Sequence, residues 1–151
     1  MDCDYDYDNK PIEFQNLTTP KARKEHKCSD CGGIIRIGER YEYSVMKYDG
    51  SICVEKRCAD CIFIVHEVGR AFYVDCESRF QPPRGRLSEA WEYTCYDIEV
   101  DKHYFELAPI ACRIVGMQRA ACAARGGNMY WSLPKSLTAE HIKELQLEVA
   151  E

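Results

Sequence analysis

The sequence predicts an α+β fold, in which a small module of knuckle, β-hairpin and helix is followed by a helical C-terminal extension. Two Cys-x-x-Cys pairs, Cys28–Cys31 and Cys58–Cys61, have 26 residues between them and can bring four thiolates together. Between them, Asp49-Gly50 is a strong signal for a two-residue hairpin turn. Behind the second pair, apolar residues recur at helical spacing in several segments. With 151 residues, the chain has room for one domain with an appendage.

Residues 1–20 are expected to form an acidic, solvated arm. They carry a net charge of −4, aspartates alternate with tyrosines at the start, and Pro11 and Pro20 interrupt any regular element. No periodic apolar face is visible in this stretch. A loosely docked tail is the favoured interpretation, and an arm that binds a partner is the alternative.

Residues 21–75 make up the predicted module. The two glycines that follow Cys31 suit the tight backbone of a knuckle. Alternating and β-branched residues then predict strands over 34–39, 41–47 and 51–57. Behind the second cysteine pair the apolar spacing is helical, so this pair lies in the first turn of a helix, where negative charge is favoured.

The C-terminal half is predicted to be mainly helical over residues 88–151. Residues 76–87 form a linker, because prolines and a glycine break any regular element there. In the next segment, 88–100, a helix with one apolar face is favoured over a strand. The face of that helix would carry Trp91, Cys95 and Ile98.

Two further helices are expected in this extension. The first covers 109–125, with Pro109 in its first turn and Gly126-Gly127 behind its end. A last helix begins near Thr138, a suitable N-cap. The apolar stripe expected to be buried on the first of these helices consists of Ile110, Ile114, Met117 and Ala121.

The cysteines of the two pairs are the predicted metal ligands. Thiolates presented by two knuckles are typical of a structural zinc site. An iron–sulfur centre and redox-active pairs are the alternatives, but a thioredoxin-type pair would need a βαβ context. His26 and His66 lie near the pairs and could replace one thiolate, although we expect both to be surface or neighbouring residues. Four thiolates leave no open coordination position, so we expect no catalytic role for the ion. Because such an ion contributes to folding, its removal by a chelator is expected to unfold residues 21–75.

The six other cysteines form no Cys-x-x-Cys pair. A second metal site built from Cys95, His103, Cys112 and Cys122 is the alternative to a role as small buried apolar residues. Cys112 and Cys122 are ten residues apart, which places them on different faces of one helix. We therefore expect one zinc ion per chain and no second site.

The charge pattern leaves nucleic-acid binding open as an alternative. The net charge of −5 does not favour a general affinity for nucleic acid, but residues 21–40 have a net charge of +3. Cations there can meet phosphates, or they can offset the negative charge of four thiolates on Zn²⁺. The candidate nucleic-acid contacts are Lys21, Arg23, Lys24, Lys27, Arg36 and Arg40.

No motif in the sequence indicates an enzyme. Nucleophilic triads, P-loops and glycine-rich dinucleotide loops are absent. A ββα-metal nuclease would need a histidine in the hairpin, and there is none between Ile34 and Arg57. We expect no enzymatic activity and assign no catalytic residues.

The expected compartment is the cytoplasm, and no membrane partner is expected. The chain begins with acidic residues rather than a basic stretch and an apolar run, and its longest apolar run is far too short to cross a bilayer. Reduced thiols in the cytoplasm favour metal ligation over structural disulfides.

The segment from Lys21 to Cys61 resembles a treble-clef zinc module of small, mostly uncharacterised phage and prophage proteins. The shared features are Ala22-Arg23-Lys24, His26-x-Cys28, a Cys-x-x-Cys-Gly knuckle, Gly38-Glu39-Arg40-Tyr41, Tyr48-Asp49-Gly50 and a second cysteine pair. The resemblance implies zinc ligation by Cys28, Cys31, Cys58 and Cys61, and expression inside a bacterial host.

The expected function is non-enzymatic binding of a host protein by a zinc-stabilised module. The resemblance, together with a small, net-acidic chain that has ten tyrosines, predicts a phage accessory factor that inhibits a host defence or regulatory complex. A zinc-rigidified hairpin would lower the ordering cost of association. The alternative is a nucleic-acid-binding transcriptional regulator that uses the basic residues around the knuckle.

Overall fold

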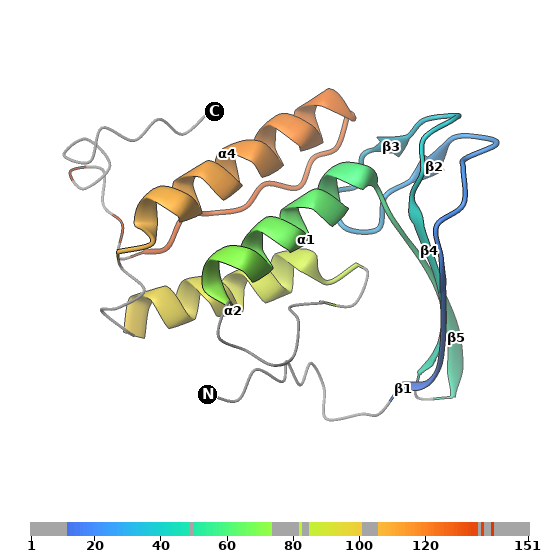
Figure 1. The fold of residues 1–151 in the computed structure, drawn as a ribbon, viewed down its shortest axis with the longest axis horizontal. Coiled ribbons are helices and arrows are strands. Elements are labelled where there is room, and N and C mark those ends of the chain that lie inside the picture. The colour runs from blue at the N-terminus through green and yellow to red at the C-terminus, as the bar shows by residue number, and fades with distance from the viewer. Residues whose placement is uncertain are drawn as a thin grey trace.

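The computed structural model describes residues 12–48, 50–73, 82, 85–100, 106–135, 137 and 140. Figure 1 shows the helices of this part grouped on one side and the larger sheet on the other, which is the predicted α+β class. The elements are β1 (Ile12–Thr18), β2 (His26–Lys27), β3 (Ile34–Ile35), β4 (Glu42–Tyr48), β5 (Ser51–Arg57), α1 (Ala59–Phe72), α2 (Leu87–Val100) and α4 (Ala108–Ala124).

The larger sheet has the strand order β1-β4-β5, and both strand pairs are antiparallel. The predicted hairpin joins β4 and β5, with Tyr48 opposite Ser51. Gly50 has a φ of 76°, which is the backbone conformation that a two-residue hairpin turn requires. Its neighbour Asp49 lies outside the described residues. The hairpin therefore confirms the strands predicted over 41–47 and 51–57.

The expectation of an arm without regular structure over residues 1–20 is wrong for residues 12–18, which form β1. This strand pairs with β4, with a register shift between Ile12 and Phe14. An edge strand is stabilised mainly by the backbone of its neighbour, so it can form without a strong periodic apolar pattern. Residues 1–11 lie outside the described part of the chain.

The second sheet is a short hairpin of β2 and β3 around the first cysteine pair. The strand predicted over 34–39 is much shorter, because β3 ends at Ile35. The chain turns directly afterwards: the Glu39 N–H donates to the Arg36 carbonyl over 3.1 Å, and Gly38 has a φ of 91°. This turn redirects the chain into β4.

The three described helices agree with the sequence pattern. α1 begins directly behind Cys58, so the second cysteine pair lies at its N-terminus. α2 settles the ambiguity over 88–100 in favour of a helix, with Trp91 and Ile98 buried. α4 has Pro109 in its first turn, as predicted. The helix expected from Thr138 and most of the linker over 76–87 lie outside the described residues.

The buried face of α4 is broader than the predicted stripe. Ile114 is fully buried, whereas Ile110, Met117 and Ala121 are only partly buried. The helix packs on α1 on one side and is covered on another by residues 128–134, which run back along it (Figure 1). The residues that these two contacts bury include Ala111, Val115, Gln118 and Cys122.

One hydrophobic core joins the cysteine-bearing module to the C-terminal helices. Trp91 of α2 stacks on Trp131 with ring centroids 4.8 Å apart, and its Nε1 donates to the Ser132 carbonyl over 2.9 Å. The same cluster of buried side chains contains Cys28 and Cys58. The extension therefore packs directly against the module that holds the cysteines.

Candidate metal centre

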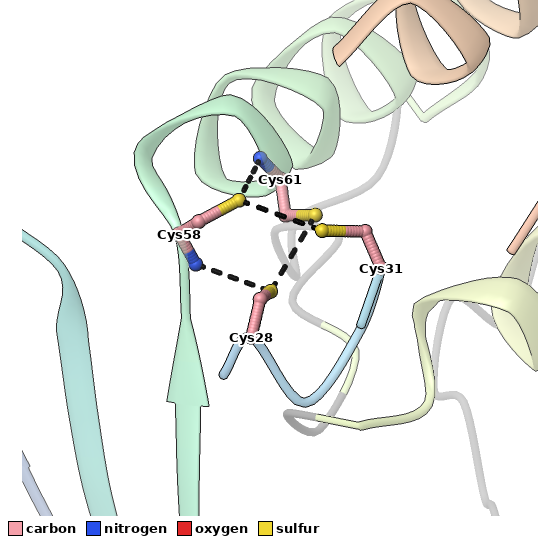
Figure 2. Close-up of side chains that lie close together, drawn as sticks. All are labelled: Cys28, Cys31, Cys58 and Cys61. Carbon is pink, nitrogen blue, oxygen red and sulfur yellow. Dashed lines mark hydrogen bonds between the residues drawn. The ribbon is translucent and has the colours of Figure 1, made fainter. Parts of the chain in front are cut away.

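The four predicted ligands lie together and are all buried. Cys28 and Cys31 come from the loop between β2 and β3, Cys58 directly follows β5, and Cys61 lies in the first turn of α1. Their sulfur atoms are all within 4.8 Å of one another. Figure 2 shows the four side chains turned toward a common centre.

The spacing of the sulfur atoms fits a tetrahedral metal ion. Cys28 Sγ lies 3.8 Å from Cys61 Sγ, and Cys31 Sγ lies 3.9 Å from Cys58 Sγ. Four sulfurs bound about 2.3 Å from a central ion stand roughly 3.8 Å apart in a tetrahedron. The tetrad therefore has both the geometry and the ligand types that a tetrahedral metal ion requires.

Backbone N–H groups are directed at three of the sulfurs. The Gly33 N–H donates to Cys31 Sγ over 3.3 Å, and the Cys58 N–H donates to Cys28 Sγ over 3.3 Å. The Cys61 N–H donates to Cys58 Sγ over 3.4 Å at the N-terminus of α1. Such donors and the helix dipole stabilise thiolates, so the local backbone is arranged for ligation.

Without a metal, the four thiols would share their protons unequally. Hydrogen bonds from the side chains of Cys31, Cys58 and Cys61 lower the pKa of Cys28. Hydrogen bonds with Cys28 in turn raise the pKa of Cys58 and Cys61. Neighbouring thiolates repel each other, so a bound cation is what allows all four cysteines to lose their protons.

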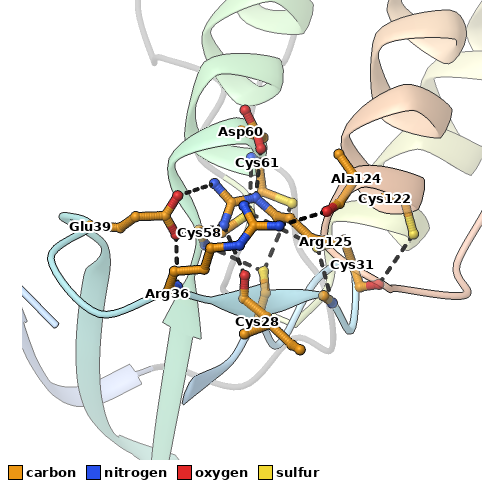
Figure 3. Close-up of polar contacts among 12 residues, drawn as sticks. Cys28, Cys31, Arg36, Glu39, Cys58, Asp60, Cys61, Cys122, Ala124 and Arg125 are labelled. Carbon is orange, nitrogen blue, oxygen red and sulfur yellow. Dashed lines mark hydrogen bonds and ion pairs between the residues drawn. The ribbon is translucent and has the colours of Figure 1, made fainter. Parts of the chain in front are cut away.

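A buried arginine, Arg125, covers one side of the tetrad (Figure 3). Its Nη1 lies 2.8 Å from Glu39 Oε2 and donates to the Ile34 carbonyl over 2.9 Å, and its Nε lies 2.5 Å from Asp60 Oδ2. Burial by itself would lower the pKa of Arg125, but the hydrogen bonds to Glu39 and Asp60 raise it above its ordinary value. This fixed positive charge offsets the negative charge of a four-thiolate centre.

The end of α4 approaches the knuckle so closely that glycine is required there. The Ile34 N–H donates to the Arg125 carbonyl over 2.8 Å. A Cβ on Gly33 would lie 2.4 Å from the Cβ of Arg125, and one on Gly127 would lie 2.5 Å from the Cys31 carbonyl oxygen. The sequence explains these glycines by the tight knuckle and by the end of the helix. The structure adds that both are needed for the close contact between these two distant segments.

A buried ion pair connects the first knuckle to α2. Asp30, between the first two cysteines, is 2 % exposed, and its Oδ2 lies 2.6 Å from Nε of Arg57. Its Oδ1 accepts the N–H groups of Gly85 and Leu87, each over 3.0 Å. Burial raises the pKa of Asp30, and Arg57 opposes that rise. Because Leu87 is the first residue of α2, Asp30 caps this helix from the metal module.

Sequence reasoning missed the roles of Arg125 and Asp30. Asp30 and Arg57 are 27 positions apart, and Arg125 and Glu39 are 86 positions apart, so no local pattern links the partners. The available signal was Asp30, an acidic residue inside the first Cys-x-x-Cys pair. A solvent-exposed polar residue at that position would look the same in the sequence. Only the tertiary fold reveals that these charges are buried and paired.

The two nearby histidines lie outside the tetrad, as expected. His26 is partly buried, with its Nδ1 3.0 Å from Nζ of Lys56 and its ring 5.1 Å from that of Tyr41. Burial, followed by the charges of Lys56 and Lys24, lowers the pKa of His26. His66 is exposed on α1. The candidate ligand set therefore consists of the four cysteines.

Within the ranges that the structure describes, no second cluster of metal ligands is found. Cys95 is half-buried on α2, and burial raises its pKa to about 12. Cys112 belongs to a small separate apolar cluster, while the Cys122 thiol donates to the Cys31 carbonyl over 3.5 Å. His103, the remaining candidate, lies outside the described residues.

The six predicted nucleic-acid contacts are all exposed around the knuckle and the β2–β3 hairpin. Arg36 donates to the Ala124 carbonyl over 2.8 Å, and Arg40 donates to the Thr19 carbonyl over 3.2 Å. In the described part of the chain, none of the six forms an ion pair with a carboxylate. The six side chains are therefore accessible to an anionic ligand, although the charge of Arg36 also helps to lower the pKa of Glu39.

Comparisons with protein-family models, curated proteins and solved structures found no match to this chain. Among the described residues, no helix combines the length and the apolar character needed to span a bilayer.

Proposed function

We propose that the tetrad holds one structural Zn²⁺ ion in a non-enzymatic module that binds another protein. Zinc suits the site because it accepts four thiolates in tetrahedral geometry without any preference from its d-electrons. Four protein ligands fill that geometry and leave no position for water or substrate. The ion would hold the knuckle, β5 and α1 in a fixed arrangement.

The observation that carries the binding proposal is the apolar, positively charged outer face of the β1-β4-β5 sheet. In this register Val54 lies opposite Val45, and Ile52 lies opposite Lys47. Ile52 is 74 % exposed and Val54 is 48 % exposed. The described side chains of this outer face are Asn16, Thr18, Tyr43, Val45, Lys47, Ile52, Val54 and Lys56.

The opposite, inner face of the sheet has a different character. It buries Ser44 and Met46, and it carries Glu42 and Glu55, the carboxylates among the described side chains of the sheet. The outer face thus combines exposed branched apolar side chains with lysines and no described carboxylate. Exposed β-branched residues on a regular, rigid surface are typical of a protein-docking site.

The resemblance to phage zinc proteins would make the partner a bacterial host protein. On that basis the proposal extends to a phage accessory factor that inhibits a defence or regulatory complex by covering part of it. The partner should present an apolar surface, since Ile52 and Val54 form the exposed apolar part of the outer face.

The binding proposal is tested by capture from bacterial lysate with a matched pair of substitutions. Ile52→Asp places a charge on the outer face, whereas Ile37→Asp changes an isoleucine of similar exposure, 68 %, in the turn before β4. We expect wild-type chain and Ile37→Asp to retain one stoichiometric protein after nuclease treatment, and Ile52→Asp to lose it. Equal capture by both variants would contradict a docking role for the outer face.

Nucleic-acid binding is the second candidate, and the exposed cations around the knuckle favour it. Six exposed lysines and arginines without carboxylate partners in the described chain could contact phosphates. Ile37 lies in the turn between Arg36 and Arg40, so Ile37→Asp would weaken this mode and leave the outer face intact.

Salt dependence separates the two candidates. Binding to phosphates weakens steeply with salt, because each neutralised phosphate releases counterions. A titration of labelled DNA and RNA at several salt concentrations should show no tight binding if the partner is a protein. Binding with a steep salt slope that Arg36→Ala and Arg40→Ala reduce would establish the second candidate instead.

A further inference from the structure

Two exposed arginines meet over one buried carboxylate on the helical side of the molecule. The side chain of Glu67, in α1, is only 8 % exposed. Its Oε1 pairs with Nη2 of Arg70, which lies one turn later in the same helix, and its Oε2 lies 3.2 Å from Nη2 of Arg113 in α4. The two guanidinium groups are therefore held together across the seam between α1 and α4, which lie side by side in Figure 1.

These two arginines use their donors differently from the buried Arg125. Arg125 directs its donors at two carboxylates and a backbone carbonyl. Arg70 and Arg113 are 73 % and 57 % exposed, and each directs one nitrogen at Glu67. Within the described ranges, neither of them forms another hydrogen bond or ion pair. A guanidinium group carries five N–H donors, so both groups keep donors that are available to a ligand.

The charges of this cluster do not balance. Two guanidinium groups and one carboxylate give a net charge of +1. Because Glu67 lies buried beneath the two arginines, the excess positive charge is at the surface. Two like charges held close together repel each other, and a single carboxylate offsets only one of them. An anion bound on the outer side would offset the other.

The shape of the two cations favours a phosphate group as that anion. A guanidinium group presents pairs of parallel N–H donors that match two oxygens of a carboxylate or a phosphate. A carboxylate has two oxygens, so one such pair of donors occupies both of them. A phosphate group has further oxygens and can accept from two guanidinium groups at once. Neighbouring arginines with unused donors therefore suit a phosphate best.

We propose that Arg70 and Arg113 together bind one phosphate group of a small molecule, either inorganic phosphate or the phosphate of a nucleotide. Both arginines contact the ligand, and Glu67 is a positioning residue that holds their side chains from below. The inference goes beyond the protein-binding proposal and does not depend on it. The phosphate site lies on the helices, whereas the outer face belongs to the β1-β4-β5 sheet (Figure 1).

A neighbouring aromatic ring distinguishes the two sources of phosphate. Phe63 lies one helical turn before Glu67, about 6 Å along the axis of α1, and is 55 % exposed. Residues four apart lie on the same side of a helix, so the base of a bound nucleotide could stack on this ring. If the source is a nucleotide, adenosine monophosphate should bind more tightly than inorganic phosphate, and Phe63→Ala should remove that difference. Equal affinities in the unmodified chain would identify inorganic phosphate as the source.

Titration of the metal-loaded full-length chain with inorganic phosphate, followed by NMR, tests the site. The side-chain Nε–H signals of Arg70 and Arg113 should shift and saturate, with half-saturation on the order of 1 mM. Sodium chloride at the same ionic strength should leave both signals in place. Shifts that do not saturate, that chloride reproduces, or that are confined to the knuckle would overturn the proposal.

A matched pair of substitutions on α4 tests whether the binding is specific. Arg113→Gln should weaken phosphate binding about tenfold or more, because one of the two guanidinium groups is lost. Arg113→Lys should not restore the affinity, since an ammonium group lacks the paired donors. Arg119→Gln removes the same charge from the same helix, where Arg119 donates to the Trp131 carbonyl, and should change the affinity by less than about twofold. Equal losses in Arg113→Gln and Arg119→Gln would contradict a defined site.

Glu67→Gln separates positioning from charge. The substitution removes a negative charge, so Coulomb attraction alone would strengthen the binding of an anion. Because Arg70 and Arg113 lose the carboxylate that holds them together, we expect the affinity for phosphate to fall about threefold or more instead. Circular dichroism checks that the variant is folded. Tighter phosphate binding by folded Glu67→Gln would overturn the positioning role of Glu67.

Discussion

The two ends of strand β5 differ in what they bury. At its C-terminal end, beside the metal centre, even the charged side chains of Arg57 and its partner Asp30 are only 2 % exposed. Near the hairpin turn, the apolar side chains of Ile52 and Val54 are 74 % and 48 % exposed. One strand of seven residues thus passes from a region where charges are buried to a region where apolar side chains face solvent.

This difference indicates a division of roles. A buried charge is costly unless it is paired and hydrogen-bonded. Asp30 and Arg125 are both paired in this way, and each connects segments that are distant in sequence. Exposed apolar residues add little to stability, but they leave a surface for a partner. On the function proposed above, the metal end would determine the fold and the hairpin end would offer the surface for binding.

Removal of the metal should have the largest effect. Binding of a structural zinc ion contributes on the order of 10–16 kcal/mol in small zinc domains at neutral pH. Because Asp30 caps α2 and Arg125 ties α4 to the knuckle, chelation should melt the C-terminal helices together with residues 21–75. Circular dichroism and tryptophan fluorescence should change together, since Trp91 and Trp131 belong to the same core. Retained helicity with an intact tryptophan signal would show two independent units.

Loss of the buried carboxylate should come next. Asp30→Ala removes the buried ion pair with Arg57 and the cap of α2, so we expect a loss of about 3–5 kcal/mol in the free energy of unfolding. Glu89→Ala breaks a partly exposed pair with Arg86 and should cost at most about 1 kcal/mol. Urea unfolding of the metal-loaded variants measures both. Similar values for the two would contradict a special role for Asp30.

Substitution of Arg125 should have a somewhat smaller effect, because its partners are partly exposed. Arg125→Met removes the contacts to Glu39 and Asp60, which are 30 % and 46 % exposed, and should cost about 2–3 kcal/mol. Arg125→Lys should not restore stability, since an ammonium cannot reach both carboxylates and the Ile34 carbonyl. Thermal unfolding of both variants tests this, and full rescue by lysine would show that charge alone suffices.

A pair of glycine substitutions probes the close approach of the knuckle and the chain behind α4. A Cβ on Gly127 would meet the Cys31 carbonyl oxygen at 2.5 Å, so Gly127→Ala should cost about 1–3 kcal/mol. Gly116 lies within α4 and has open space around it, so Gly116→Ala should stabilise by about 0.5–1 kcal/mol. In thermal unfolding, we expect Gly127→Ala to lower the melting temperature and Gly116→Ala to raise it. A neutral Gly127→Ala would show that this contact can relax.

The hairpin end should show the smallest change in stability. Ile52→Asp alters a side chain that is 74 % exposed, so we expect at most about 1 kcal/mol, mainly from β-propensity. The same substitution should abolish partner capture. A large loss of stability would instead mean that the outer face is covered within the folded chain.

The sequence was most informative where the determining residues are close together along the chain. Two short cysteine motifs, a turn dipeptide and helical apolar spacing are local signals, and within the described residues they led to the hairpin and to the three helices. The edge strand β1 was missed because its stabilisation comes from the backbone of β4. The buried partners of Arg125 and Asp30 were missed because charged residues look alike in sequence whether they are buried or exposed.

Native mass spectrometry of the full-length chain, purified under reducing conditions, tests the central claim most directly. The account predicts a compact chain with one zinc ion, and loss of both the ion and the compact charge-state distribution when Cys58 and Cys61 are replaced by serine. A compact chain that carries no metal would contradict the claim that the buried tetrad holds an ion on which the whole fold depends.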